Sequence, residues 1–477
     1  MNYKTPGVYI EEIQKLPPSI AQVETAIPVF IGYTEKAEDA RGFSLLLEPR
    51  RIASLLEYER FFGRAQAEAG SLTVTITERV GQPTNIFAKV NAQARSKYWM
   101  YYSLQLYFAN GGGPCWIVSV GDYTVSGGTV GFSELKAGLD NIKKIDEITL
   151  ILFPDAQNLT TAPDYYNLYG EAMDMCQEMK DRFTVMDVWH DPTLPPEEWR
   201  ENIKTLRDIT GNEIDTLKYG CAYFPNVETI LDYWYGGEGI GDSNVLIEHV
   251  GGDGTYAGTL AELRSKNNAL YFLARNAVRD VPVELPPSSG IVGIYANVDN
   301  TRGVWKAPAN VNMDFAIKPV IRITDQEQSS LNVDENSGKS INVIRTFTGR
   351  GPAIVWGSRT LAGNDNEWRY IPVRRFYNMV EESTKKATEQ FVFEPNDANT
   401  WTRVKSMIEN FLTLQWRAGA LMGASTEEAY FVKVGLNETM TELDIWEGRM
   451  IVEIGMAVVR PAEFIILRFS HKMLQES

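Results

Sequence analysis

Apolar runs and amphipathic stretches alternate regularly between residues 115 and 224. The runs are short and rich in β-branched and aromatic side chains, whereas the stretches between them repeat their apolar residues at helical spacing. This order is typical of right-handed βαβ units, in which a largely parallel sheet is covered by helices. We expect strands at residues 27–33, 115–120, 148–153, 184–189 and 219–224, and helices at residues 94–110, 133–145, 164–182, 196–209 and 259–278.

The last third of the chain has a different pattern. Two strand-like runs at residues 341–347 and 353–356 flank Gly349-Arg350-Gly351, where glycine permits the positive φ of a turn. The fold class that we predict is therefore α/β plus α+β: a domain with a largely parallel sheet and flanking helices, followed by an α+β domain. The elements expected after the turn are helices at residues 373–391 and 400–419 and strands at residues 430–434, 450–459 and 463–469.

Residues 36–95 give a mixed signal. They combine a helical pattern at residues 51–62 with a threonine-alternating strand at residues 72–77. Because this segment interrupts the alternation around it, we expect a surface insertion in the first domain.

Both ends of the chain have the pattern of adhesive β-strands. The first, residues 6–13, precedes every expected element, and the second, residues 463–469, follows the last expected helix. A strand at a sheet edge offers unpaired N–H and C=O groups, so two apolar terminal strands favour pairing with other copies of the chain. The alternative, that both ends complete the chain's own sheets, stays open. The residues expected to make these contacts are Val8, Tyr9, Ile10, Glu11, Ile13, Phe464, Ile465, Ile466, Leu467 and Phe469.

The charge of the chain argues against two classes of partner. It has 62 acidic and 46 basic residues, which give a formal net charge of -16 at pH 7. Binding to nucleic acid or to an anionic lipid surface rests on Lys and Arg. We therefore expect no nucleic acid partner and no direct membrane insertion.

The cysteines and the first residues indicate a protein that is made in the cytoplasm. Cys115, Cys176 and Cys221 are far apart in the sequence and follow no disulfide or zinc spacing. The chain begins without the layout of a secretion signal, and no apolar run reaches the ~20 residues that span a bilayer. A reducing compartment fits this pattern.

Asp155 gives the best indication of an enzyme. It stands at the carboxyl end of an expected parallel strand, where open α/β sheets usually bind their ligands. The glycine-rich loop at residues 236–241 lacks the preceding strand and following helix of a nucleotide-binding motif. A turn or helix-cap role is favoured for Asp155, and a cytosolic α/β enzyme with a ligand site near Asp155 and this loop is the alternative.

No residue spacing indicates a catalytic triad or a metal site. The three histidines, His190, His249 and His471, stand apart from Cys, Asp and Ser residues that could complete such a site. We therefore predict no catalytic residue, no cofactor and no metal ligand.

One region reverses the overall charge. Residues 342–375 contain six arginines and two acidic residues. Because a planar guanidinium group pairs with carboxylates in two-point geometry, such a region can bind acidic surfaces of other copies. Ion pairs within one chain are the open alternative. The candidate electrostatic patch between subunits consists of Arg345, Arg350, Arg359, Arg374 and Arg375.

Four ordered blocks carry a family resemblance. They are Pro6-Gly7-Val8-Tyr9-Ile10-Glu11-Glu12, Arg302-Gly303-Val304-Trp305-Lys306-Ala307-Pro308, Val355-Trp356-Gly357-Ser358-Arg359 and Phe393-Glu394-Pro395-Asn396-Asp397. Together they resemble the contractile tail sheath family, which is shared by phage tails, R-type pyocins and extracellular contractile injection systems. The resemblance covers nearly the whole chain except residues 36–95.

The resemblance implies a structural subunit and no enzyme. Subunits of this family stack as hexameric rings around an inner tube, and contraction from a metastable extended state drives the tube through a target envelope. The implied partners are further copies of the chain, the inner tube protein, and baseplate and terminal cap proteins. The particle, assembled in the cytoplasm, is a virion or an injection system. A terminator or baseplate component is a further alternative.

The resemblance also implies a division of labour along the chain. Residues 1–23 and 461–477 would be linking arms that exchange strands with neighbouring subunits, residues 24–305 an outer domain, and residues 306–460 an inner core domain. The helix expected at residues 400–419 would face the tube. Its candidate tube contacts are Arg403, Lys405 and Arg417.

Overall fold

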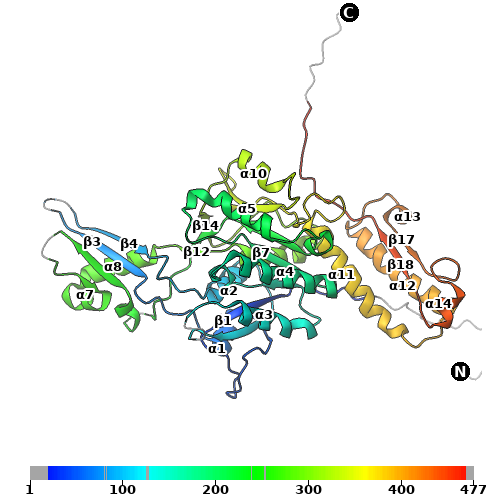
Figure 1. Cartoon of the computed structure of the whole chain (residues 1–477), viewed down its shortest axis with the longest axis horizontal. Coiled ribbons are helices and arrows are strands. Elements are labelled where there is room, and N and C mark those ends of the chain that lie inside the picture. Colours follow the sequence, from blue (N-terminus) through cyan, green and yellow to red (C-terminus); the bar gives the residue numbers. More distant parts are fainter. Residues whose placement is uncertain are drawn as a thin grey trace, which may run out of the picture. The chain divides into compact units, whose positions relative to one another are not determined.

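The computed structural model describes residues 20–79, 81, 83–124, 128–237, 239–251 and 254–468. The chain divides into two compact units (Figure 1): a larger one, residues 24–378 and 460–477, and a smaller one, residues 1–23 and 379–459. The division falls inside a long helix and not near residue 305, because three strands between residues 311 and 355 belong to the main sheet of the larger unit. The division into arms, outer domain and core domain within an assembly stays a prediction.

Nine strands form the main sheet of the larger unit, in the order β13-β16-β15-β8-β7-β6-β1-β5-β2. The neighbouring strands from β15 to β5 are all parallel, and antiparallel strands stand at the two edges. Every residue of β1, β6, β7 and β8 is buried, as in strands that are covered on both faces. The predicted largely parallel sheet is confirmed. The bounds are β1 (Pro28–Thr34), β2 (Arg50–Ile52), β5 (Cys115–Asp122), β6 (Leu150–Leu152), β7 (Phe183–Asp187), β8 (Gly220–Phe224), β13 (Val311–Asn312), β15 (Ile341–Phe347) and β16 (Gly351–Val355).

Helices cover both faces of this sheet. Successive residues of β1 point to opposite faces: Val29 and Ile31 pack with one buried cluster and Phe30 with the other. The first cluster contains α3 (Phe132–Asn141), α4 (Ala162–Met179) and α5 (Trp199–Ile209), and the second contains α2 (Met100–Ala109) and α9 (Ser288–Arg302).

The sequence pattern predicts four of these five helices. It misses α9, because ten residues of α9 are buried and a helix that is enclosed on most sides has no amphipathic period. α2 begins six residues later than the expected helix at 94–110, because a carboxylate from another element fixes its start at Trp99 and Met100.

Residues 72–90 belong to a second sheet. β3 (Leu72–Thr77) pairs with β4 (Asn85–Val90) and, in parallel, with β10 (Leu246–Val250), which also pairs with β11 (Gly258–Thr259). The segment expected as a surface insertion thus shares a four-stranded sheet with residues far along the chain. The helix expected at 259–278 is two helices, α7 (Leu260–Lys266) and α8 (Asn268–Arg279), because the Asn267 side chain accepts hydrogen bonds from the first N–H groups of α8.

Short elements complete the larger unit. A three-stranded antiparallel sheet has the order β12-β9-β14, and α1 lies within the helix predicted at residues 51–62. None of the described helices is both long and apolar enough to cross a membrane. The bounds are α1 (Leu55–Phe62), α6 (Ile214–Leu217), β9 (Val227–Thr229), β12 (Val283–Leu285), β14 (Ala316–Pro319) and α10 (Asp325–Asn332).

The smaller unit is a helical hairpin with a two-stranded sheet. α11 (Ile371–Thr388) enters it from the larger unit, α12 (Ala398–Arg417) returns, and β17 (Tyr430–Lys433) pairs antiparallel with β18 (Glu453–Met456). Tyr430 OH donates to the carbonyl of Glu409 at 3.1 Å, which joins the sheet to α12. Two short helices, α13 (Thr426–Ala429) and α14 (Glu442–Trp446), complete the unit.

Among the described residues, the expected C-terminal strand at 463–469 is not formed within the chain. Residues 461–468 pair with no described residue as a strand, and Phe469 lies outside the described residues. Pairing of this segment with another copy stays a prediction.

Two buried carboxylates cap helices at the carboxyl edge of the main sheet. Asp155, just after β6, accepts hydrogen bonds from the N–H groups of Trp99 and Met100 at 2.5 and 3.1 Å, at the start of α2. Asp187, the last residue of β7, accepts one from the N–H of Ser288 at 2.9 Å, at the start of α9. These helix starts therefore occupy the edge where enzymes of similar topology bind their ligands.

Burial shifts the pKa of Asp187. Desolvation raises its pKa to about 7, although hydrogen bonds from Ser288 oppose the shift. A carboxyl group whose pKa is higher in the folded than in the unfolded chain stabilises the fold less as pH rises toward that value. We predict that Asp187→Asn, which keeps the acceptor oxygen, raises the free energy of unfolding by about 1–3 kcal/mol more at pH 8 than at pH 5.

Denaturant unfolding at the two pH values measures this difference. Asp155→Asn is the contrasting variant: both oxygens of Asp155 face N–H donors, because Oδ2 also accepts from Tyr33 at 2.7 Å. An amide nitrogen there would face a donor, so this variant should destabilise the chain at both pH values. A pH-independent effect of Asp187→Asn would contradict the prediction.

Candidate functional site

The two features of the enzyme alternative lie on different elements. Asp155 is fully buried and caps α2, which confirms the helix-cap role. The described glycines of the 236–241 loop precede β10 of the four-stranded sheet, and Gly236, Gly237 and Gly239 have positive φ of 103°, 85° and 84°. The loop is therefore a series of turns, and the described residues give no contact between it and Asp155.

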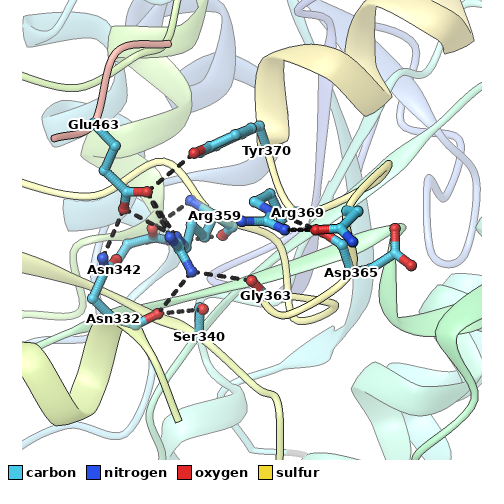
Figure 2. A network of polar contacts seen from close by, with 10 residues as sticks. Asn332, Ser340, Asn342, Arg359, Gly363, Asp365, Arg369, Tyr370 and Glu463 are labelled. Atoms are coloured by element: carbon cyan, nitrogen blue, oxygen red, sulfur yellow. Dashed lines mark hydrogen bonds and ion pairs between the residues drawn. The ribbon is translucent and has the colours of Figure 1, made fainter. Parts of the chain in front are cut away.

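The C-terminal segment is fastened to the larger unit through Glu463 (Figure 2). Its carboxylate accepts hydrogen bonds from two nitrogens of Arg359, from Nη2 at 2.6 Å and from Nε at 2.9 and 3.1 Å. It also accepts one from Asn332 Nδ2 at 2.6 Å and one from Tyr370 OH at 3.1 Å. We refer to Asn332, Arg359, Tyr370 and Glu463 as the C-terminal clamp.

Arg359 is itself held rigidly. The residue is 3% exposed, and its Nη1 donates to the carbonyl of Gly363 at 3.0 Å. Asn342 fixes its backbone from both sides, because Oδ1 accepts from the N–H of Arg359 at 2.7 Å and Nδ2 donates to its carbonyl at 2.8 Å. The position of Glu463 is thus defined by a guanidinium group that has little freedom to move.

The clamp favours the charged form of Glu463. Burial, the largest effect, disfavours the carboxylate, but hydrogen bonds from Arg359 and Asn332 more than offset it and hold the pKa of Glu463 below its usual value. Removing one partner of a buried ion pair leaves the other charge uncompensated, which makes such a pair costly to break.

Four apolar side chains follow the clamp directly. Phe464, Ile465, Ile466 and Leu467 are 68%, 79%, 78% and 72% exposed. Burying one such side chain stabilises an assembly by about 1.5–3 kcal/mol, so the segment is suited to a partner surface. These residues belong to the predicted C-terminal contact set.

The root of the N-terminal segment has a second clamp. Arg375 and Asp299 form a two-point pair at 2.5 and 3.1 Å, with side chains that are 3% and 4% exposed. Thr25 joins it, because its Oγ1 donates to Asp299 at 2.6 Å and its carbonyl accepts from Arg375 at 2.9 Å. We call these three residues the N-terminal clamp. The predicted contacts Val8, Tyr9, Ile10, Glu11 and Ile13 lie outside the described residues.

The structure does not gather the five patch arginines on one surface. Arg359 and Arg375 belong to the two clamps. Arg374 is 2% exposed, donates to Asn378 Oδ1 at 2.8 Å and lies 4.5 Å from the ring centre of Trp368. For these three arginines, the contacts are within one chain.

The other two patch arginines lie nearer the surface. Arg345 pairs with Asp325 at 2.6 Å. Arg350 is exposed and lies 5.2 and 4.8 Å from the ring centres of Phe347 and Trp356. Contact with other subunits stays a prediction, and Arg350 is the arginine best placed for it.

The candidate tube contacts lie on α12. Arg403 and Arg417 are exposed and Lys405 is half-buried. Arg403 pairs with Glu394 at 3.5 Å and stays on the exposed face of the helix. The opposite face is buried and comprises Val404, Met407, Ile408, Phe411, Leu412 and Gln415. A tube contact stays a prediction.

Sequence reasoning missed the roles of Glu463 and Asp299. Glu463 lies 104 residues from Arg359, and Asp299 lies 76 residues from Arg375, so no local pattern connects the partners. The one available signal is that Glu463 directly precedes the apolar run of the expected C-terminal strand.

The comparisons with known proteins all match tail sheath proteins or contractile injection systems. A family model described as the phage tail sheath C-terminal domain matches residues 363–472. Tail sheath proteins of Vibrio phage KVP40 and Enterobacteria phage T4 are 29% and 26% identical to this chain over 130 and 133 residues. These alignments cover 27% and 28% of this chain and 19% and 20% of the phage proteins, so the chain matches about a fifth of their length.

Solved structures match over nearly the whole chain. The anti-feeding prophage helical sheath in the contracted state is 31% identical, with 98% of this chain and 100% of that chain covered and a TM-score of 0.63. A chain of the six-fold symmetrised anti-feeding prophage baseplate is 32% identical, with 99% and 100% covered and a TM-score of 0.63. The PVC sheath complex of an extracellular contractile injection system, also contracted, is 28% identical, with 99% of both chains covered and a TM-score of 0.64.

Replacing the acid of the C-terminal clamp should weaken the larger unit. Glu463→Gln keeps the side-chain shape but leaves buried Arg359 without its counter-charge, so we expect the free energy of unfolding to fall by about 1–3 kcal/mol at pH 7. Hydrogen exchange of residues 457–463 should become faster. The control is Glu178→Gln, whose exposed pair with Lys143 at 3.0 Å should contribute less than about 0.5 kcal/mol. Equal effects of both variants would contradict the role of the clamp.

The same pair predicts a pH dependence. Because the folded-state pKa of Glu463 is lowered, its contribution is fully present above the unfolded pKa, near 4.5, and is lost as pH falls through the lower folded value. The stability difference between the unsubstituted chain and Glu463→Gln should therefore be constant from pH 7 to pH 5 and shrink below pH 4.5. Denaturant titrations across this range measure it, and a difference that grows on acidification would refute the assignment.

Proposed function

Because the chain belongs to the contractile tail sheath family, we propose that it forms hexameric rings, stacked helically around an inner tube, that contract from a metastable extended state. The observation that carries this proposal is the 31% identity to a helical contractile sheath across nearly the full length of both chains. Members of this family are structural subunits, and a role without catalysis follows for this chain.

The terminal arms are the proposed links between subunits. A two-stranded sheet is marginal on its own, and β17 with β18 forms such a sheet in the smaller unit. Strands added by the arms of neighbouring copies would satisfy its outer edges and cover apolar side chains such as Phe431, which is 44% exposed. The exposed run from Phe464 to Leu467 has the composition of such a strand.

The clamps make these links compatible with contraction. The C-terminal arm would leave its own subunit directly after the buried Arg359–Glu463 pair, and the N-terminal arm would precede the buried Ile20. Both arms would end in a neighbour's sheet. Subunits could then rotate and slide while the connections persist. Each subunit needs to gain only a few kcal/mol between two packings, and a polymer of many copies sums that gain. A high barrier, set by contacts to the tube and the baseplate, would keep the extended state populated.

The proposed partners are further copies of the chain, an inner tube protein that contacts Arg403, Lys405 and Arg417, and baseplate and terminal cap proteins. The chain would be made and assembled in the cytoplasm as part of a phage tail-like particle, which is a virion or an injection system. No nucleic acid or membrane contact is part of the proposal.

Truncation of either arm tests the proposal. Removing residues 464–477 keeps Glu463 and the clamp, and removing residues 1–20 keeps Thr25. Both variants should remain folded monomers with unchanged circular dichroism and should fail to form tubes in electron micrographs. The intact chain, which should form rings or tubes at high concentration, is the reference.

Three results would contradict the proposal in different ways. Tubes formed by a truncated variant would remove the arms from the assembly mechanism. Closed rings that never elongate would favour a terminator or baseplate component. An intact chain that stays monomeric at high concentration would count against the sheath itself.

A further inference from the structure

A cleft lies between α5 and the end of α10 in the larger unit. Its volume is about 320 Å³, which falls at the small end of the range of about 300–1,000 Å³ for natural binding pockets. The floor of the cleft is apolar and consists of Trp199, Ile203 and Leu331, which are all buried. The cleft is therefore suited to one or more apolar side chains.

The rim of the cleft is charged, and part of this charge has no partner. Arg200 and Arg207 pair with acidic side chains of α10 and of the turn after it. Lys204 and Asp208, one turn apart on α5, are exposed, and neither forms a hydrogen bond or an ion pair with another described residue. An occupant with a positive charge next to its apolar side chains would therefore meet an unpaired carboxylate.

The C-terminal segment begins beside this cleft. Asn332, which donates to Glu463 at 2.6 Å, directly follows Leu331 of the cleft floor (Figure 2). The five described residues after Glu463 span about 16 Å when extended, which exceeds the diameter of a helix with its side chains, about 10–12 Å. The segment is thus long enough to pass around the end of α10 and enter the cleft, which belongs to the same compact unit.

We propose that, in the unassembled subunit, the C-terminal segment folds back and inserts apolar side chains of residues 464–467 into this cleft, where Arg468 pairs with Asp208. The segment has the chemistry that the cleft requires, because the exposed Arg468 directly follows the apolar run. The exposed arrangement of the segment in the structure is then its released form, which is ready to be donated.

The tether favours the chain's own segment over that of a second copy. A segment anchored beside its site has an effective concentration in the range of about 1 mM, which dilute free subunits do not reach. The consequence for assembly rests on the proposed function. Because a neighbour can receive only the released arm, its apparent affinity is reduced by the released fraction, and polymerisation of free subunits is delayed.

Disulfide cross-linking of the full-length subunit, below the concentration at which it assembles, tests the position of the segment. Ser330→Cys, an exposed position that lines the cleft, is combined with Ile466→Cys. The three native cysteines are buried. We expect a disulfide within the monomer, visible as a shifted monomer band on a non-reducing gel, to form at least about tenfold faster than in the control.

The control combines Ser329→Cys with Ile466→Cys. Ser329 is also an exposed serine of α10 that donates to the carbonyl three residues earlier, at 2.7 Å against 2.8 Å for Ser330, but it is not part of the cleft lining. The same two positions test the delay. Ser330→Trp, which fills the cleft, should shorten the lag before tubes form by at least about threefold, and Ser329→Trp should leave the lag unchanged.

Each result separates one part of the proposal from the others. Equal cross-linking from Ser329 and Ser330 would overturn the folded-back segment. Cross-linked dimers in place of monomers would assign the cleft to a second copy and overturn the choice of occupant. An unchanged lag in Ser330→Trp would overturn the delay of assembly. If the unsubstituted chain never polymerises, the proposed function fails, whereas the cross-link within the monomer is measured without assembly.

Discussion

Buried pairing of arginine with a carboxylate holds the folded body together next to each terminal segment. Arg359 with Glu463 and Arg375 with Asp299 are both two-point pairs with little exposure to solvent. A charge buried in this way is stable only with its partner in place, so Arg359 requires the segment that carries Glu463 to remain attached. Arg375 and Asp299 both lie in helices of the folded body, and Thr25 adds hydrogen bonds to their pair. The surrounding sheet and helices hold the arginines, and the arginines in turn hold Glu463 and Thr25 in place.

The carboxyl edge of the main sheet holds the starts of two helices. In many α/β proteins the carboxyl ends of parallel strands leave a crevice for a ligand. Here Asp155 and Asp187 point from that edge to the first N–H groups of α2 and α9. The free N–H groups at the start of each helix are satisfied by a residue of the chain itself. The topology that makes an enzyme plausible from the sequence thus serves as a rigid scaffold, in keeping with a family of structural subunits.

The sequence predicts the parts of this fold that have a local signature. The strands β1, β5, β6, β7 and β8 are short apolar runs because both faces of the sheet are covered, and α4 and α12 show a one-sided apolar pattern. α9 is hidden because it is enclosed on most sides, and the pairing of β3 with β10 depends on residues about 170 positions apart. For the candidate site, the exposed run after Glu463 is visible in the sequence, whereas the partners of the clamps are not, because ion pairs over such separations leave no periodicity.

The two-stranded sheet of the smaller unit has a consequence for how growth could be stopped. In the proposed assembly, a copy that has lost its arms by proteolysis would keep β17 and β18 and could still receive strands, but it would have none to donate. Such a copy would join the growing end of the sheath and block the addition of the next subunit. A small fraction of cleaved subunits could therefore stop elongation. The length of the sheath would then be sensitive to small amounts of cleaved protein. Assembly would require intact terminal arms in every copy, and a correctly folded body alone would not be enough.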